Sequence, residues 1–126
     1  MSGFTMALGI GLLGALGAAA RYLMVEWMAR WWRKPFPLAI FLINIIGAFL
    51  LGVLTTAFAS PAQLSARLLL GVGFLGGYTT FSTLSYETVA LARRGDTLYA
   101  WMNVGGTLLA GVVAAFLGMS FGLRLG

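Results

Sequence analysis

Hydroxyl and amide side chains gather around one point of an otherwise apolar sequence. Residues 76–85 read Gly-Gly-Tyr-Thr-Thr-Phe-Ser-Thr-Leu-Ser, so two adjacent glycines precede five Ser and Thr hydroxyls. Two amides, Asn44 and Asn103, lie in other apolar segments. Hydroxyls and amides offer hydrogen-bond donors, which suit an anion, whereas a conducted multivalent cation usually requires rings of carboxylates or carbonyls. This cluster contains no carboxylate, and Arg21 and the net charge of +5 also favour an anion.

Phe81 adds an aromatic ring to this stretch, and the positive edge of such a ring can face a small anion while the ring excludes water. The Gly76-Gly77 pair predicts a helix break near residues 76–80, whose freed carbonyls could hold a fixed cation. Two simpler interpretations stay open. The hydroxyls could bond back to helix carbonyls at a kink, and Asn44 could make an ordinary interhelical hydrogen bond.

The elements that position these residues are predicted to be transmembrane helices. The 126 residues are 60% apolar and only 9% charged, against about 25% charged in a soluble domain. The mean hydropathy is +0.95. We expect an all-α membrane protein of one transmembrane domain, residues 1–126, with no cleavable signal and no extramembrane domain. Its four spanning helices are predicted at about residues 4–28, 37–58, 67–92 and 97–121, with a break in the third and both termini on one side.

Small residues line one face of each helix and predict close helix packing. In the first helix this face includes Gly14, Gly17 and Arg21, and in the fourth it includes Thr107 next to Asn103. Arg21 is either a side chain that reaches the membrane interface or a cation that attracts anions into a vestibule. Four helices are too few to enclose a pore and shield these polar faces, so we expect a homo-oligomer, most simply a dimer.

Several function classes are excluded by composition. The chain has no Cys and no His, which excludes thiol chemistry, disulfides and the usual transition-metal sites. With three acidic residues and no nucleophile–base pair, we expect no enzyme. The basic residues lie at helix ends, where they anchor the chain to lipid headgroups, so nucleic acid is not an expected partner.

The sequence resembles the Fluc/CrcB family of small fluoride ion channels over essentially its whole length. The residues that carry the resemblance are the run 73–83 (Gly-Phe-Leu-Gly-Gly-Tyr-Thr-Thr-Phe-Ser-Thr) with Ser85 and Glu87, the run 44–47 (Asn-Ile-Ile-Gly) with Gly52, and Gly17-Ala18 with Arg21. The resemblance implies a dual-topology, antiparallel homodimer with two pathways that passively exports fluoride and confers fluoride resistance. It implies a multi-pass protein of the bacterial or archaeal plasma (inner) membrane.

The resemblance also implies roles for single residues. Main-chain carbonyls of Gly76 and Thr79 would hold a sodium ion at the dimer centre. Arg21 and Glu87 would serve the pore mouth, either as a pair or separately. The fluoride pathway would include Asn44, Phe81, Ser82, Thr83, Leu84, Ser85, Asn103 and Thr107.

Two positions depart from the family pattern. Leu84 stands where a second pore phenylalanine is expected, and Asn103 stands where Tyr is frequent, which keeps a donor with a different reach. The loops after the first and third helices hold five of the basic residues, which by the positive-inside rule puts both termini outside the cytoplasm. Because an antiparallel homodimer needs both orientations, an obligate heterodimer of oppositely inserted homologues is the alternative. Two further alternatives are a proton-coupled multidrug exporter using Glu26 and a non-transporting subunit.

Overall fold

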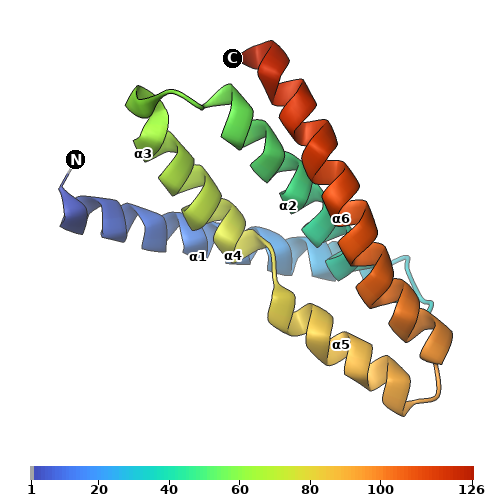
Figure 1. The fold of residues 1–126 in the computed structure, drawn as a ribbon. Helices are drawn as coiled ribbons and strands as arrows, with labels where there is room; N and C mark the ends of the chain where they lie inside the picture. The colour runs from blue at the N-terminus through green and yellow to red at the C-terminus, as the bar shows by residue number, and fades with distance from the viewer. Residues whose placement is uncertain (1) are drawn as a thin grey trace.

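The computed structural model describes residues 2–126, and its helices account for most of them. Four helical segments are long and apolar enough to cross a membrane. The first is α1 (Gly3–Met28), the second is α2 (Leu38–Ala57) and the last is α6 (Thr97–Leu125). The structure thus has the predicted all-α architecture of four candidate spans, and α6 extends four residues beyond the predicted end (Figure 1).

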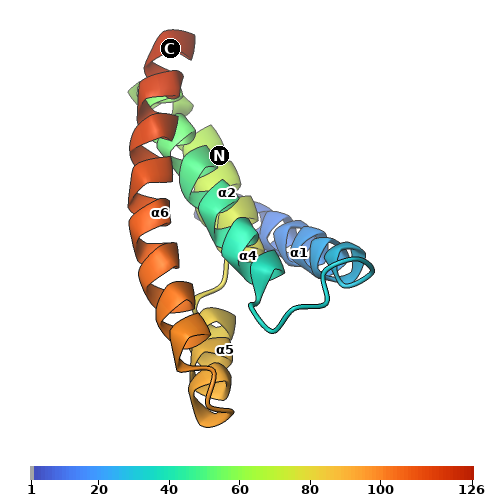
Figure 2. The same ribbon diagram turned by 90° about the vertical axis from the view of Figure 1, so that its right-hand side faces the viewer.

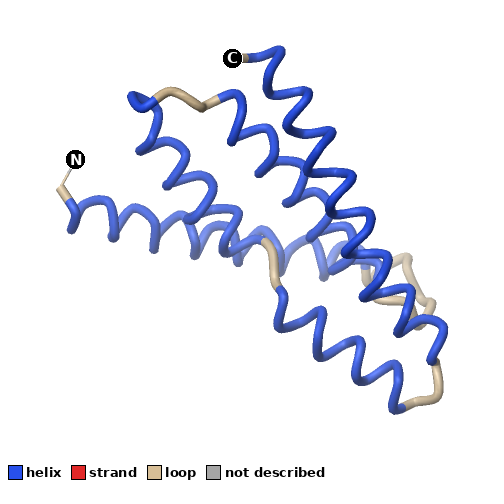
Figure 3. The backbone as a smooth tube through the Cα atoms, in the orientation of Figure 1, coloured by secondary structure: helices blue, strands red, loops and turns tan. Residues whose placement is uncertain are grey.

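The third span is built from several pieces. A 3₁₀ turn, η1 (Pro61–Gln63), leads into α3 (Leu64–Arg67), a π-helical stretch η2 (Leu68–Leu75) and α4 (Gly76–Tyr78). Two extended residues, Thr79 and Thr80, then precede α5 (Phe81–Arg93). This interruption is the loop between α4 and α5 in the middle of Figure 3. The sequence did not predict the π-helical stretch, because hydrophobic periodicity does not distinguish a π-turn from an α-turn over eight residues.

Helix packing relies on glycines at points of close backbone approach. The residues of α1 pack on η2 and α4, while α2 packs along α6 (Figure 2). A Cβ atom on Gly17 would collide with the Phe74 carbonyl, and one on Gly118 would collide with the Phe49 carbonyl. Close helix approach by small residues is how membrane helices gain van der Waals contact without a hydrophobic driving force.

The α5 helix is separated from the first part of the third span by the interruption, and it packs mainly on α6. Gly95 follows the end of α5, and its φ of +88° places it in the left-handed conformation that is common just after a helix. The Asp96 N–H then bonds the Leu91 carbonyl at 2.9 Å. The tight turn that follows returns the chain into α6, so α5 and α6 lie antiparallel side by side.

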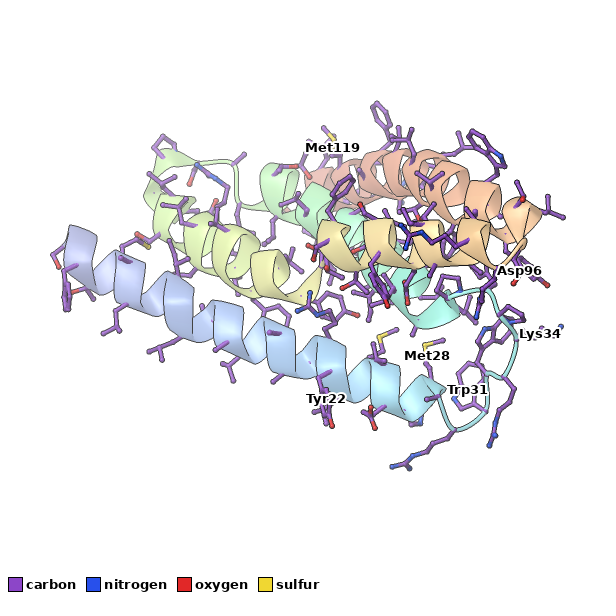
Figure 4. The ribbon with its side chains drawn as sticks, turned by 90° about the horizontal axis from the view of Figure 1, so that it is seen from below. Tyr22, Met28, Trp31, Lys34, Asp96 and Met119 are labelled. Atoms are coloured by element: carbon purple, nitrogen blue, oxygen red, sulfur yellow. The ribbon has the colours of Figure 1, made fainter. Side chains whose placement is uncertain are left out.

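The ends of the spans divide into two groups. The α1–α2 loop, with Trp31 and Lys34, lies at the same end of the chain as Asp96 in the α5–α6 turn (Figure 4). Both termini and the α2–η1 connection lie toward the other end (Figure 1). At that other end, Arg67 donates hydrogen bonds to the carbonyls of Phe58 and Ser60, which lie at and beyond the end of α2.

Candidate functional site: the interrupted third span

The interruption consists of Thr79 and Thr80, which have extended φ, ψ angles of −81°, 159° and −150°, 122°. The break falls within the predicted range 76–80, and Gly76 and Gly77 themselves are helical residues of α4. Gly77 is instead a packing residue: a Cβ atom there would overlap the Gly14 carbonyl of α1. The break therefore begins three residues after the start of the glycine pair.

Asn44 of α2 pairs with the backbone of Thr80. Its Nδ2 donates to the Thr80 carbonyl at 3.0 Å, and its Oδ1 accepts from the Thr80 N–H at 2.9 Å. Unpaired backbone groups at membrane depth cost several kcal/mol each, and this one amide satisfies both groups of an extended residue. The interhelical hydrogen bonding that was one possible role of Asn44 is thus present, and its partner is Thr80 in the break.

The hydroxyls beyond the break form two separate arrangements. Thr79 Oγ1 donates back to the Leu75 carbonyl at 2.9 Å, as in an ordinary kink. Thr80 Oγ1 caps α5 by accepting from the Thr83 N–H at 3.2 Å, and it also lies 3.3 Å from Ser82 Oγ and 3.1 Å from Thr83 Oγ1. The back-bonding interpretation therefore holds for Thr79, whereas Thr80, Ser82 and Thr83 form a hydroxyl cluster at the start of α5.

The break places two helix ends of opposite polarity close together. The α4 C-terminus has free carbonyls and a partial negative charge, while the α5 N-terminus has free N–H groups and a partial positive charge. The Thr80 N–H would bond the Gly76 carbonyl in a continuous α-helix, but it bonds Asn44 instead. An anion is therefore favoured at the α5 side, and a cation is favoured at the α4 side.

Arg21 reaches this break from α1. Its Nη1 donates to the Thr79 carbonyl at 3.2 Å, so the guanidinium lies beside the interruption. No ion pair joins Arg21 to Glu87 among residues 2–126, where the Arg94–Asp96 pair at 3.6 Å is the one salt bridge. The positive charge of Arg21 is consequently available to an anion near the break.

An open hollow of about 320 Å³ lies against the α4 side of the break. Gly76, Thr79, Asn44 and Gly47 are among the residues that line it. Both residues whose carbonyls the resemblance assigns to a cation thus border the same hollow. The Cγ2 of Thr79 fills the space that a Cβ on Gly47 would occupy, which explains why α2 has a glycine there.

The expected pathway residues on α5 differ in exposure. Phe81 is 79% exposed and Ser82 is exposed, whereas Leu84 is only 6% exposed and belongs to the core of this chain. Ser85 and Thr83 are half-buried. Phe81 therefore projects outward, while position 84 packs inward.

Asn103 and Thr107 lie inside the chain. Asn103 is fully buried, and its Nδ2 donates to Thr88 Oγ1 at 3.0 Å. Its Oδ1 and the Thr107 Oγ1 are buried without a hydrogen-bond partner among the described residues. Sequence reasoning missed Thr88, although its position one residue after Glu87, on the helix with most of the hydroxyls, was the available signal.

Glu87 borders a cavity of about 320 Å³ between the C-terminal end of α1, the α1–α2 loop and α5. Lys34 and Arg94 also line this cavity. One carboxylate oxygen of Glu87, Oε1, is buried without a partner in the described part of the chain. Glu87, the middle residue of α5, therefore faces the same cavity as the basic residues Lys34 and Arg94.

Known proteins were compared with this chain. The family described as "CrcB-like protein, Camphor Resistance (CrcB)" matches residues 8–119. The chain belongs to the CrcB family. A "Fluoride-specific ion channel FluC" of Acidobacterium capsulatum is 41% identical over 118 residues, which cover 92% of this chain and 94% of the relative. "Fluoride-specific ion channel FluC 1" of Bacillus cereus is 39% identical over 115 residues (90% and 84%), and a FluC of Idiomarina loihiensis is 44% identical over 107 residues (84% and 83%).

Membership in the CrcB family confirms the resemblance found in the sequence. These relatives are named ion channels rather than enzymes. Together with four candidate spans, they identify this CrcB-family chain as a multi-pass protein of the bacterial inner membrane.

Proposed function

We propose that this CrcB-family chain is a fluoride-selective ion channel through which fluoride leaves the cell passively, which lowers fluoride toxicity. The observation that carries the proposal is the break at Thr79–Thr80, where a helix N-terminus, a hydroxyl cluster and the Arg21 guanidinium come together without a carboxylate. Such donors suit a small, strongly hydrated anion because they can replace its water. The fluoride channels among its relatives support the choice of anion.

The proposed pathway begins near Arg21 and Asn44 and continues along α5. The second Nδ2 hydrogen of Asn44 is free to donate, because the first bonds Thr80. Phe81 would present its ring edge, and the hydroxyls of Ser82, Thr83 and Ser85 would follow it. Leu84 of α5 with Asn103 and Thr107 of α6 would complete the path, and Glu87 would lie at its mouth.

We propose an antiparallel homodimer as the conducting unit. In a single chain, the exposed Ser82 and the Asn44 and Thr79 residues that border the hollow would meet lipid at membrane depth, which is unfavourable for polar groups. A second copy would cover them. The exposed Phe81 of one chain would then approach the other chain, so each pathway would draw residues from both copies.

A central sodium ion fits the same assembly. Gly76 and Thr79 both line the hollow, and the C-terminal end of a helix favours a cation. One chain offers these two oxygens, and a twofold partner would double them. The Arg21 contact uses one lone pair of the Thr79 oxygen and leaves the other. The bound cation would offset part of the repulsion between anions in a low-dielectric bundle.

Alternative functions find less support. A proton-coupled exporter requires an acid embedded in the membrane, whereas Glu26 is exposed and lies two residues before Met28, the last residue of α1. The heterodimer differs from the homodimer only in the identity of the second chain, so one experiment distinguishes the two assemblies.

That experiment is fluoride efflux from liposomes that contain only this purified chain, measured with a fluoride electrode, with chloride release as the comparison. We expect rapid fluoride release without chloride release, and single-chain activity would exclude an obligate heterodimer. The absence of fluoride release from a correctly folded sample would contradict a self-sufficient channel.

A further inference from the structure

The contact between α5 and α6 contains one hydrogen bond between side chains, which joins Thr88 and Asn103. The Thr88 Oγ1 lies 2.7 Å from the Leu84 carbonyl and 3.0 Å from Asn103 Nδ2. Asn103 is completely buried, so water from outside the chain does not compete for this bond. Neither the family roles described above nor our sequence expectations include Thr88.

The hydrogens of this pair can be assigned from chemistry alone. A carbonyl oxygen can only accept, so the single hydroxyl hydrogen of Thr88 goes to Leu84. The Thr88 oxygen can then act toward Asn103 only as an acceptor. The Asn103 group that faces Thr88 must therefore be the NH₂ group, and the amide oxygen must point away from it.

This assignment changes the chemistry expected of Asn103. Its inward atom, Oδ1, is an acceptor and is buried without a partner, one helical turn from the equally unpartnered Thr107 hydroxyl. An acceptor repels an anion instead of binding it. One of the two Nδ2 hydrogens of Asn103 is bound to Thr88, so at most one hydrogen of this amide remains to donate elsewhere.

The same bond controls the placement of α5. The extended residues Thr79 and Thr80 join α5 to the first half of the third span, and α5 packs mainly on α6. The angle of α5 therefore depends on its contact with α6. Phe81, Ser82 and Ser85 all lie on α5, so their positions depend on the same contact.

We propose that Thr88 is a positioning residue of the pathway: its hydroxyl orients the Asn103 amide, with the oxygen inward, and ties α5 to α6. The proposal rests on the function proposed above. It adds to that function a residue that fixes the orientation in which Asn103 faces the pathway.

The orientation can be tested without any transport assay. The chain has two asparagines, Asn44 and Asn103, so protein labelled with ¹⁵N-asparagine in detergent micelles gives two side-chain amide pairs. Thr88→Val should shift the Asn103 pair and leave the Asn44 pair in place, and Thr88→Ser should restore the wild-type position. If Thr88→Val does not fold, Thr88→Ala removes the same hydroxyl. Unchanged Asn103 signals in a folded hydroxyl-free variant would overturn the proposal.

The link to transport can be tested by a double-mutant cycle in liposomes. Thr88→Val should slow fluoride efflux about threefold, the factor that corresponds to an average interhelical hydrogen bond in a membrane. In an Asn103→Leu background, Thr88→Val should have no further effect, and Thr88→Ser should recover most of the wild-type rate. Independent effects of the two substitutions, or a Ser variant as slow as the Val variant, would contradict the positioning role.

Thr55→Val is the matched control. The Thr55 hydroxyl bonds the Gly52 carbonyl of its own helix at 2.8 Å and ties no second helix, so this substitution should leave efflux within twofold of wild type. A wild-type chain without fluoride efflux would refute the proposed function, while the asparagine signals would still decide whether Thr88 orients Asn103.

Discussion

Substitution of Asn44 by Leu removes both hydrogen bonds that hold Thr80 while keeping a side chain of similar size. The Thr80 N–H and carbonyl would lose partners at 2.9 and 3.0 Å. Thr80 is only 8% exposed, so water does not readily replace the amide. We therefore expect Asn44→Leu to destabilise the break itself rather than only to alter the pathway.

The magnitude follows from the two groups involved. Interhelical hydrogen bonds in membranes average about 0.6 kcal/mol each, which gives a lower bound of about 1.2 kcal/mol for two. A buried backbone group left unsatisfied costs about 1–3 kcal/mol, which gives an upper range of about 2–6 kcal/mol for two. We expect a loss of about 2–3 kcal/mol, above the lower bound and within the upper range.

The assay is reversible unfolding in mixed micelles of a mild and a denaturing detergent, paired with fluoride efflux. Ile46→Leu, on the lipid-exposed part of the same helix, is the volume control and should change the unfolding free energy by less than about 0.5 kcal/mol. Asn44→Asp keeps an acceptor for the Thr80 N–H but loses the donor. It should be intermediate in stability, and it should slow fluoride by adding negative charge.

If Asn44→Leu unfolds within about 0.5 kcal/mol of wild type, the pairing with Thr80 does not stabilise the break. If it is destabilised as expected yet conducts fluoride at the wild-type rate, Asn44 is a structural residue only, and the part of the pathway that we assign to it is wrong.

Four other changes test the remaining parts of the site. Phe81→Ile should strongly reduce fluoride efflux because it removes the aromatic ring, and it should leave dimerisation in a cross-linking assay intact; wild-type efflux would remove the ring from the pathway. Gly77→Ala should lower the yield of folded protein because its Cβ overlaps a backbone carbonyl of α1, whereas Gly105→Ala, with no atom within 4 Å of the new Cβ, should be tolerated; equal yields would refute the close packing. Leu84→Phe should cost about 1–3 kcal/mol of unfolding free energy through overpacking, because Leu84 is buried, and a faster efflux in this variant would show that the missing ring limits conduction. Exchange of sodium for potassium should lower the thermal midpoint of the folded dimer by mass action if the break carbonyls hold sodium, and an identical midpoint in both salts would contradict that site.

The sequence was sufficient to predict the class of protein and the neighbourhood of the site. Apolar length alone required four spanning helices, since a helix needs about 20 apolar residues to cross the bilayer. A run of hydroxyls within such a span was sufficient to predict an interruption of the third helix. The absence of carboxylates from that run favoured an anion, and the chain proved to belong to a family with named fluoride channels.

Local sequence could not assign single residues to their roles. Gly76-Gly77 suggested unwound backbone, because glycine serves equally for a break and for close helix contact. Only the position of Gly14 on α1 made Gly77 a packing residue and moved the break to Thr79. The π-helical stretch Leu68–Leu75 was likewise invisible in the apolar pattern.

The two asparagines also show what the sequence alone determined and what only the tertiary structure decided. Sequence alone determined that each amide lies in an apolar helix and therefore needs a partner, because an unsatisfied polar group in the membrane is costly. The partners are 36 residues away for Asn44 and 15 residues away for Asn103. These residues, which are far apart in the sequence, come into contact only when α2 approaches the break and α5 folds back on α6. Tertiary structure therefore decided that Asn44 holds Thr80 and that Asn103 donates to Thr88. It also decided that Phe81 is exposed while Leu84 is buried, because helix packing and not sequence spacing determines which residues of a helix meet a neighbour.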